Sequence, residues 1–295
     1  MNFHEYQQRA LETDQVPAHG ADGRIVPLLG LAGEAGELLS EYKKYLRDGD
    51  AHRLFTDRVA EELGDLLWYL ANVASKFDLD LTEIAETNLA KVRDRWLLRG
   101  RPATETGFVH VFDAGYADHE RLPRQFTARV VEGREGDTLK VRLFVNDQPI
   151  GDPLTDNAYA PDDYRFHDVF HLAHAAVLGW SPVVRSLMGR KRKSQPAVDE
   201  VEDGGRAIAI EEGLTAVIFD YARRHAFLEG VTALDSQLLR TIKSVTAHLE
   251  VTRCTYGDWE AAVLQGFAVW REIVHHRGGQ MEVNLDSRSI QYRAA

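Results

Sequence analysis

Two pairs of acidic residues have the spacing that metal-dependent phosphate chemistry needs. Glu34 and Glu37 lie three positions apart in GLAGEAGELLSEYKK, and Glu62 and Asp65 have the same spacing in VAEELGDLLWYLANVA. Residues three apart on a helix share a face, with Cβ atoms roughly 5–6 Å apart. Two such helices packed antiparallel would gather four carboxylates in one small volume, where cations must offset their repulsion. Carboxylate oxygens favour Mg²⁺ or Mn²⁺, which suit phosphate chemistry.

Apolar residues with a 3.6-residue period predict that both segments are amphipathic helices. The acids lie at the border of each apolar stripe, one position before a stripe residue. Glu41 extends the first acidic row, and no cation interrupts the row before Lys43 and Lys44. The alternative is that these acids are only solvated helix surface. The stripes are Leu28, Leu31, Ala35, Leu38, Leu39, Tyr42 and Leu46, then Val59, Leu63, Leu66, Leu67, Leu70, Val73 and Ala74.

A third helix is predicted from Leu81 to Trp96, and its polar face could bind substrate. Asn88, Lys91 and Arg95 have the spacing i, i+3 and i+7 on this segment. The two cations could bind phosphate oxygens, and the amide a base or a sugar. The alternative is a solvated face whose cations the helix dipole favours near the C-terminus.

The acidic pattern resembles a known enzyme family. The order E-x-x-E, 24 residues, E-x-x-D, with the segments GLAGEAGEL and EELGDLLWYL, resembles the all-α nucleoside triphosphate pyrophosphohydrolases of the MazG and dimeric dUTPase type. The resemblance covers residues 1–100. It implies that Mg²⁺, or alternatively Mn²⁺, is held by Glu34, Glu37, Glu62 and Asp65. It also implies a substrate role for the N-x-x-K-x-x-x-R pattern and assembly as a homodimer or homotetramer.

The reaction implied by this resemblance is hydrolysis of a nucleoside triphosphate, ribo or deoxy, to a monophosphate and pyrophosphate. A carboxylate that the metal does not fully occupy could act as the general base. Glu37 is the first candidate for this role, and Glu34 and Glu62 remain open. The identity of the base and the number of metal ions are not fixed by these patterns.

Composition limits the class of protein. The chain has 295 residues, enough for two domains, and a net charge of −11 that argues against non-specific nucleic-acid binding. No apolar run is long enough for a membrane span, and the N-terminus lacks the features of a signal peptide. Cys254 is the single cysteine, which excludes an intramolecular disulfide framework. We expect a cytoplasmic protein that binds neither membranes nor nucleic acids.

The composition and the residue pattern of the sequence change after residue 100. The segment RGRPATETG is typical of a linker, which we place at residues 101–120. Alternating residues from Phe126 to Val130 and from Leu139 to Val145 predict a β-hairpin, with the loop near EGREGD. Residues after Pro161 are again helical in pattern. The prediction is a mainly α protein: a helical module at 1–100 and a mostly helical domain at 121–295 with a small antiparallel β insert.

The second domain contains a further cluster of chemical interest. The segment DDYRFHDVFHLAHAAVLGW carries three histidines on one predicted helix face, and a later apolar helix carries two glutamates. Imidazoles at this spacing could bind a second metal. The His-Asp pair weakly resembles that of HD-type metal phosphohydrolases. The alternative is a buried polar network that fixes helix packing. The residues are His167, Asp168, His171, His174, Glu211 and Glu212.

Three functions therefore remain open. A pyrophosphohydrolase that uses the acidic quartet is favoured, because a protein that only binds nucleotide need not keep every acid. The second is a nucleotide sensor or interaction protein, in which the C-terminal domain relays the bound state. The third is a metal-dependent phosphohydrolase that uses the C-terminal histidines.

Overall fold

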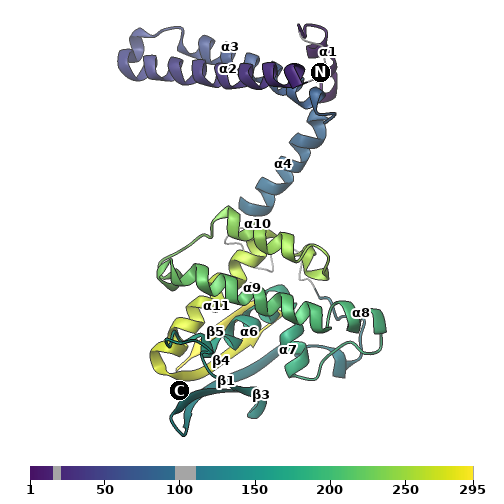
Figure 1. Ribbon diagram of the computed structural model, residues 1–295, viewed down its shortest axis with the longest axis vertical. Coiled ribbons are helices and arrows are strands. Elements are labelled where there is room, and N and C mark those ends of the chain that lie inside the picture. The colour runs from purple at the N-terminus through teal and green to yellow at the C-terminus, as the bar shows by residue number, and fades with distance from the viewer. Residues whose placement is uncertain (16–20, 97–110, 295) are drawn as a thin grey trace. The chain divides into compact units, whose positions relative to one another are not determined.

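The chain divides into two compact units. The computed structural model describes residues 1–15, 21–96 and 111–294. Unit 1 comprises Met1–Arg93, and unit 2 comprises Asp94–Ala295. Unit 1 is helical, whereas unit 2 combines helices with one sheet (Figure 1). The prediction of a mainly α protein with a small antiparallel β element is confirmed.

Unit 1 is built around two long antiparallel helices, α2 and α3 (Figure 1). The short 3₁₀ helix η1 lies between them, so the chain reverses within a few residues. The apolar periodicity thus predicted the helices correctly. The elements are α1 (Phe3–Leu11), α2 (Ala21–Asp48), η1 (Gly49–Ala51), α3 (Phe55–Lys76) and α4 (Leu81–Trp96).

A glycine allows α2 and α3 to approach each other closely. A Cβ atom placed on Gly30 would lie 2.1 Å from Cε1 of Tyr69, well inside van der Waals contact. Any larger residue at this position would therefore push the Tyr69 ring away from α2. The close approach is relevant to function because both acidic pairs lie on these two helices.

Unit 1 buries little apolar surface by itself. Much of the apolar stripe predicted for α2 is on the surface of the single chain: Leu39 is 70% exposed and Leu46 is 68% exposed. The stripe is therefore not covered by other described residues of this unit. The buried hydrophobic cluster consists of Ala10, Ala71, Ala74 and Leu81, with Tyr6 and Trp68 packed against it.

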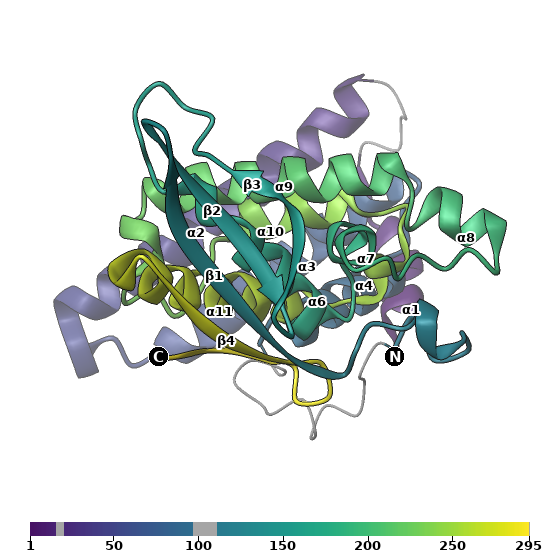
Figure 2. The same cartoon turned by 90° about the horizontal axis from the view of Figure 1, so that it is seen from below.

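Unit 2 contains a five-stranded antiparallel sheet in the order β3-β2-β1-β4-β5, of which Figure 2 labels the first four strands. The predicted alternation in β1 is confirmed, because Phe126, Ala128 and Val130 are buried and the residues between them are not. Asn146 and Asp147 both have positive φ, as the favoured two-residue hairpin turn requires. The strands are β1 (Gln125–Glu135), β2 (Thr138–Val145), β3 (Gln148–Leu154), β4 (Gly278–Asn284) and β5 (Ser289–Arg293).

The sheet is larger than the hairpin expected from the sequence. The expected six-residue loop is only the turn at Gly136 and Asp137, because the polar residues before it stay paired with β2. The strands β4 and β5 come from the C-terminal end of the chain, and β4 pairs with β1. This pairing joins segments about 150 residues apart, which local alternation does not reveal.

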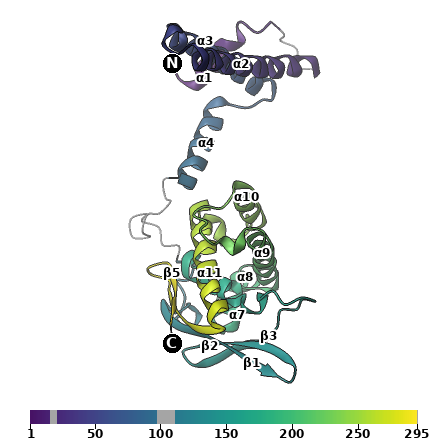
Figure 3. The ribbon, with the colours of Figure 1, turned by 90° about the vertical axis from the view of Figure 1, so that its left-hand side faces the viewer.

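Helices cover one side of the sheet in two layers (Figure 3). The helices α6 and α11 pack on β4 and β5, while α9 and α10 lie beyond them. Every residue of α6 from Val169 to Leu178 is buried, so its polar side chains must find partners inside the unit. The helices are α6 (Asp168–Leu178), α7 (Pro182–Leu187), α8 (Pro196–Val201), α9 (Gly205–Arg223), α10 (Ser236–Val245) and α11 (Tyr256–His276).

The segment expected to be a linker lies partly outside the described residues. Its remainder, 111–120, packs into unit 2, where Asp113 and Glu120 are buried. Arg185 donates to the Asp113 carboxylate at 2.8 Å, and the Ser194 backbone N–H donates to Glu120 at 2.7 Å. In the described part of the chain, no helix is long and apolar enough to cross a membrane.

Candidate active site

Three of the four predicted acids meet between α2 and α3. Glu34 on α2 and Glu62 and Asp65 on α3 each offer an oxygen, and these atoms lie within 4.8 Å of one another. Glu34 and Glu62 are half-buried, whereas Asp65 is exposed. Glu37 is exposed and is not part of this group. The antiparallel packing thus brings together acids that are 31 positions apart in the chain, from Glu34 to Asp65.

The electrostatics of the site favour a bound cation. Burial raises the pKa of Glu62, and the charges of Glu34 and Glu37 raise it further. Among the described residues, none of the four acids forms an ion pair with a lysine, arginine or histidine. No ion pair among the described residues therefore relieves the repulsion between these carboxylates, although Arg58 interacts with Glu62 at longer range. An all-oxygen carboxylate donor set fits Mg²⁺ or Mn²⁺.

Glu41, which extends the acidic row in the sequence, has a different environment. Its carboxylate is buried, pairs with Lys44 and lies 2.9 Å from Nε2 of His52. The hydrogen bond from Lys44 is the main reason that the pKa of Glu41 is lowered. Glu41 and Lys44 therefore neutralise each other, and neither belongs to the acid group.

The predicted substrate-binding residues are on α4. Asn88 is exposed and lines a shallow hollow with Asp80, Glu83 and Thr87. Within the described residues it makes no hydrogen bond to the acids of α2 and α3. Lys91 and Arg95 belong to α4, but their side chains lie outside the described part of the structure.

The six residues singled out in the second domain lie together in unit 2. Oxygen and nitrogen atoms of His167, Asp168 and His171 lie within 4.8 Å of one another, and so do those of His171, His174 and Glu211. Glu212 approaches from the next position on α9, with Oε2 3.3 Å from Nε2 of His171. The spacing of the histidines predicted that they share one helix face. The fold brings the carboxylates of Glu211 and Glu212, on α9, next to them.

In the most buried part of this cluster, His171, His174 and Glu211 interact strongly with one another. Burial lowers the pKa of His171, but Glu211 and Glu212 outweigh this effect and raise the pKa to about 10. Burial raises the pKa of Glu211, but His171 and His174 outweigh it and lower the pKa to about 2. Sequence reasoning missed Ser181, whose hydroxyl donates to Glu211 at 3.0 Å. Its position before Pro182, as a helix N-cap, marks only a helix start.

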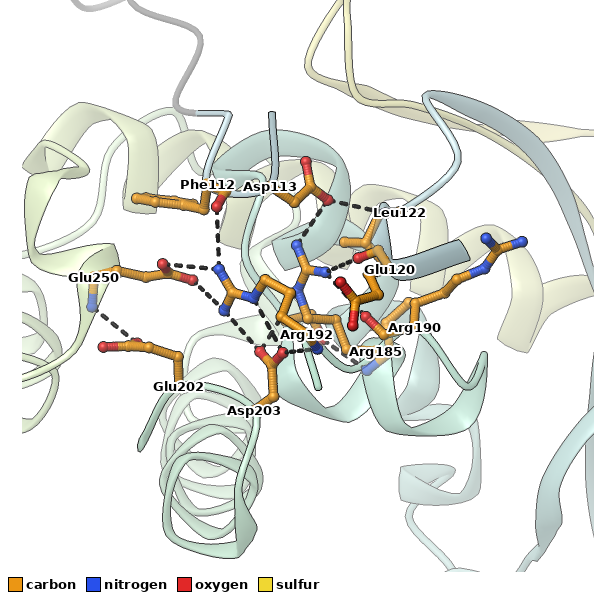
Figure 4. A network of polar contacts seen from close by, with 12 residues as sticks. Phe112, Asp113, Glu120, Leu122, Arg185, Arg190, Arg192, Glu202, Asp203 and Glu250 are labelled. Atoms are coloured by element: carbon orange, nitrogen blue, oxygen red, sulfur yellow. Dashed lines mark hydrogen bonds and ion pairs between the residues drawn. The ribbon is translucent and has the colours of Figure 1, made fainter. Parts of the chain in front are cut away.

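Two arginines of the sequence Arg190-Lys191-Arg192-Lys193 have a structural role. Arg192 is buried and donates to Asp203 and Glu250 at 2.6–3.0 Å (Figure 4). Arg185 lies beside it and joins Asp113, from the segment before β1. Arg190 donates to the backbone oxygen of Asp118 at 2.7 Å. This network ties the loop after α7 to the turn between α8 and α9, to Glu250 and to residues 112–120.

Comparisons with known proteins also match two separate parts of the chain. The family model of the MazG nucleotide pyrophosphohydrolase domain matches residues 27–96, and that of the MazG C-terminal domain matches residues 107–295. The Gene 37 protein of Mycobacterium phage L5 is 35% identical over 109 residues, which cover 34% of this chain and 96% of that protein. No solved structure matches the chain. The chain belongs to the MazG family, and its N-terminal unit carries a nucleotide pyrophosphohydrolase domain, a hydrolase of phosphoanhydride bonds.

Proposed function

We propose that unit 1 hydrolyses nucleoside triphosphates to monophosphate and pyrophosphate with Mg²⁺ at the acids of α2 and α3. The observation that carries this proposal is the group of Glu34, Glu62 and Asp65, whose oxygens lie close together and form no ion pair with the described residues. A bound Mg²⁺ supplies positive charge for the phosphates and makes a nearby water easier to deprotonate. Mn²⁺ has the same ligand preference and is expected to substitute.

The four acids have different roles in this proposal. Glu34, Glu62 and Asp65 hold the cation, because their oxygens already converge. Glu37 is exposed and lies one turn from Glu34, so its carboxylate is free to accept the proton of the attacking water. The water oxygen forms a new bond to phosphorus, the bond to the bridging oxygen breaks, and pyrophosphate leaves. Asn88, Lys91 and Arg95 on α4 are proposed to contact the nucleotide, with the two cations on its phosphates.

Assembly of several copies of the chain is part of this proposal. Among its described residues, unit 1 has a core of four buried hydrophobic side chains, while much of the apolar stripe of α2 is exposed. Exposed apolar surface of this kind marks an interface in soluble proteins. We propose that unit 1 of one chain covers the same helices of another, as a dimer or a tetramer.

The test is product analysis on a panel of ribo- and deoxynucleoside triphosphates, with Mg²⁺ and with a chelator. The proposal expects monophosphate and pyrophosphate in equal amounts, and only when the metal is present. Release of inorganic phosphate instead would contradict it and point to different chemistry. Nucleotide binding without turnover would also contradict it and favour a sensor.

A further inference from the structure

Two histidines of unit 2 direct the same ring nitrogen toward one carboxylate oxygen. Nε2 of His171 lies 3.3 Å from Oε2 of Glu212, and Nε2 of His167 lies 3.8 Å from the same oxygen. The other nitrogen of each ring faces an acceptor. Nδ1 of His167 lies 2.9 Å from the Tyr164 carbonyl oxygen, and Nδ1 of His171 lies 3.1 Å from Oε1 of Glu211. His167, which donates through Nδ1 to this carbonyl, keeps a lone pair on Nε2 that can bind a metal.

His171 is the residue that most needs a partner. Its side chain has no exposed surface, yet neither ring nitrogen makes an aligned hydrogen bond with the described residues. A buried polar atom left in this state is unfavourable, so it requires an explanation. The neighbouring carboxylates are within ion-pair distance but not in line with the ring. A cation between Nε2 and the carboxylates would satisfy this nitrogen.

The charge around these rings also favours a cation. Asp168, Glu211 and Glu212 contribute three carboxylates, and among the described residues none of them forms an ion pair with a lysine or an arginine. Metal binding needs the coordinating histidines in their neutral form. A divalent ion would offset in part the negative charge of the carboxylates that face them.

The surroundings hold the ligands in place. The ring of Tyr164 stacks on that of His167, with centroids 4.4 Å apart and planes 11° apart. Glu211 is fixed by the Ser181 hydroxyl and by the Val183 backbone N–H, both at 3.0 Å. Such outer contacts orient the ligands of metal sites and fix the tautomer of a coordinating histidine.

We propose that His167, Asp168, His171 and Glu212 bind a divalent transition-metal ion, with Glu211 behind His171 as the group that orients its ring. Two imidazoles and two carboxylates suit Zn²⁺, Co²⁺, Fe²⁺ or Mn²⁺ better than Mg²⁺, which prefers oxygen. Glu212 is 42% exposed at its side chain, so it gives the ion access from solvent. The site is built wholly from residues of unit 2 and is independent of the reaction proposed for unit 1.

The test is a Co²⁺ titration of the full chain, stripped with a chelator and then held in excess Mg²⁺, which occupies the acids of unit 1. The proposal expects one equivalent of Co²⁺ with visible d–d absorption, displaced by one equivalent of Zn²⁺. The variants His171→Gln and His167→Gln should weaken Co²⁺ binding at least about 100-fold, since even outer-sphere partners are worth 10- to 100-fold. His248→Gln, an exposed histidine of the same unit, should bind as the wild type does.

Two results would overturn the proposal. One is that the wild type binds no equivalent of Co²⁺ or Zn²⁺ in excess Mg²⁺. The cluster would then be a buried polar network without a metal. The other is equal Co²⁺ binding by wild type, His167→Gln and Glu212→Gln. These two positions lie toward the outside of the cluster, so their variants should fold even if His171→Gln does not. Circular dichroism of each variant confirms folding before the titration is interpreted.

Discussion

At the scale of single residues, Glu37 differs from the other acids because it does not belong to the converging group. We therefore predict that Glu37→Gln lowers kcat by about 100-fold or more, as loss of a general base does, while leaving metal affinity close to that of the wild type. Glu62→Gln should instead weaken the metal. Mn²⁺ titration by electron paramagnetic resonance, with Mg²⁺ as competitor, measures the affinities. Equal loss of affinity in both variants would show that Glu37 is a metal ligand as well.

The raised pKa of Glu62 predicts how stability depends on pH when no metal is bound. A carboxyl whose pKa is higher in the folded state binds protons more tightly there. Its contribution is complete below the unfolded pKa of about 4.3 and is lost as pH rises through the folded pKa. In chelator, the stability of wild type relative to Glu62→Gln should fall across this window. Thermal unfolding of both proteins measures it, and a difference that rises with pH would contradict the assignment.

At the scale of elements, the Arg192 network joins the loop after α7 to the turn before α9 and to Glu250. We predict that Arg192→Met destabilises unit 2 by about 3–5 kcal/mol, because the buried Asp203 and the half-buried Glu250 would lose the guanidinium that pairs with both. Lys193→Met, at the exposed neighbouring position, should change stability by less than about 0.5 kcal/mol. Denaturant unfolding measures both. A loss of similar size in the two variants would contradict the role given to Arg192.

The elements differ in how far the sequence predicts them. The acidic pairs and helices of unit 1 follow from local spacing, so α2, α3 and α4 were predictable. The pairing of β1 with β4 was not predictable, because these strands are far apart in the sequence. The short pattern of polar and apolar residues in each segment does not show which strand it pairs with. In the same way, spacing placed His167 and His171 on one face, but only packing of α9 shows that Glu212 meets them.

At the scale of the whole molecule, the exposed stripe on α2 predicts association. Leu39→Asp should shift the protein toward the monomer, because it places a charge at a surface that the proposed assembly buries. Val217→Asp is the matched control, since it makes a similar change at a 51% exposed position of α9. Light scattering after size-exclusion chromatography measures the mass. A wild-type monomer, or an unchanged oligomer in Leu39→Asp, would contradict this interface.

The division into two units explains which part of the function was predictable. Unit 1 carries a dense local motif, and its chemistry follows from the acids themselves. The apolar stripe indicated a helix but not what covers it, because no other described residue of the same unit 1 packs over the most exposed part of the stripe. The site residues Lys91 and Arg95 remain predictions, since they rest on their spacing along α4.

The central claim is that the acids of α2 and α3 perform the hydrolysis. The most direct measurement is pyrophosphate release with Mg²⁺ by wild type, Glu62→Gln and the control Glu61→Gln, whose exposed carboxylate pairs with Arg58 at 2.6 Å. The account predicts turnover in wild type and Glu61→Gln and a loss of at least about 100-fold in Glu62→Gln, because a direct ligand should be worth more than an outer-sphere partner. Undiminished pyrophosphate release by folded Glu62→Gln would contradict it.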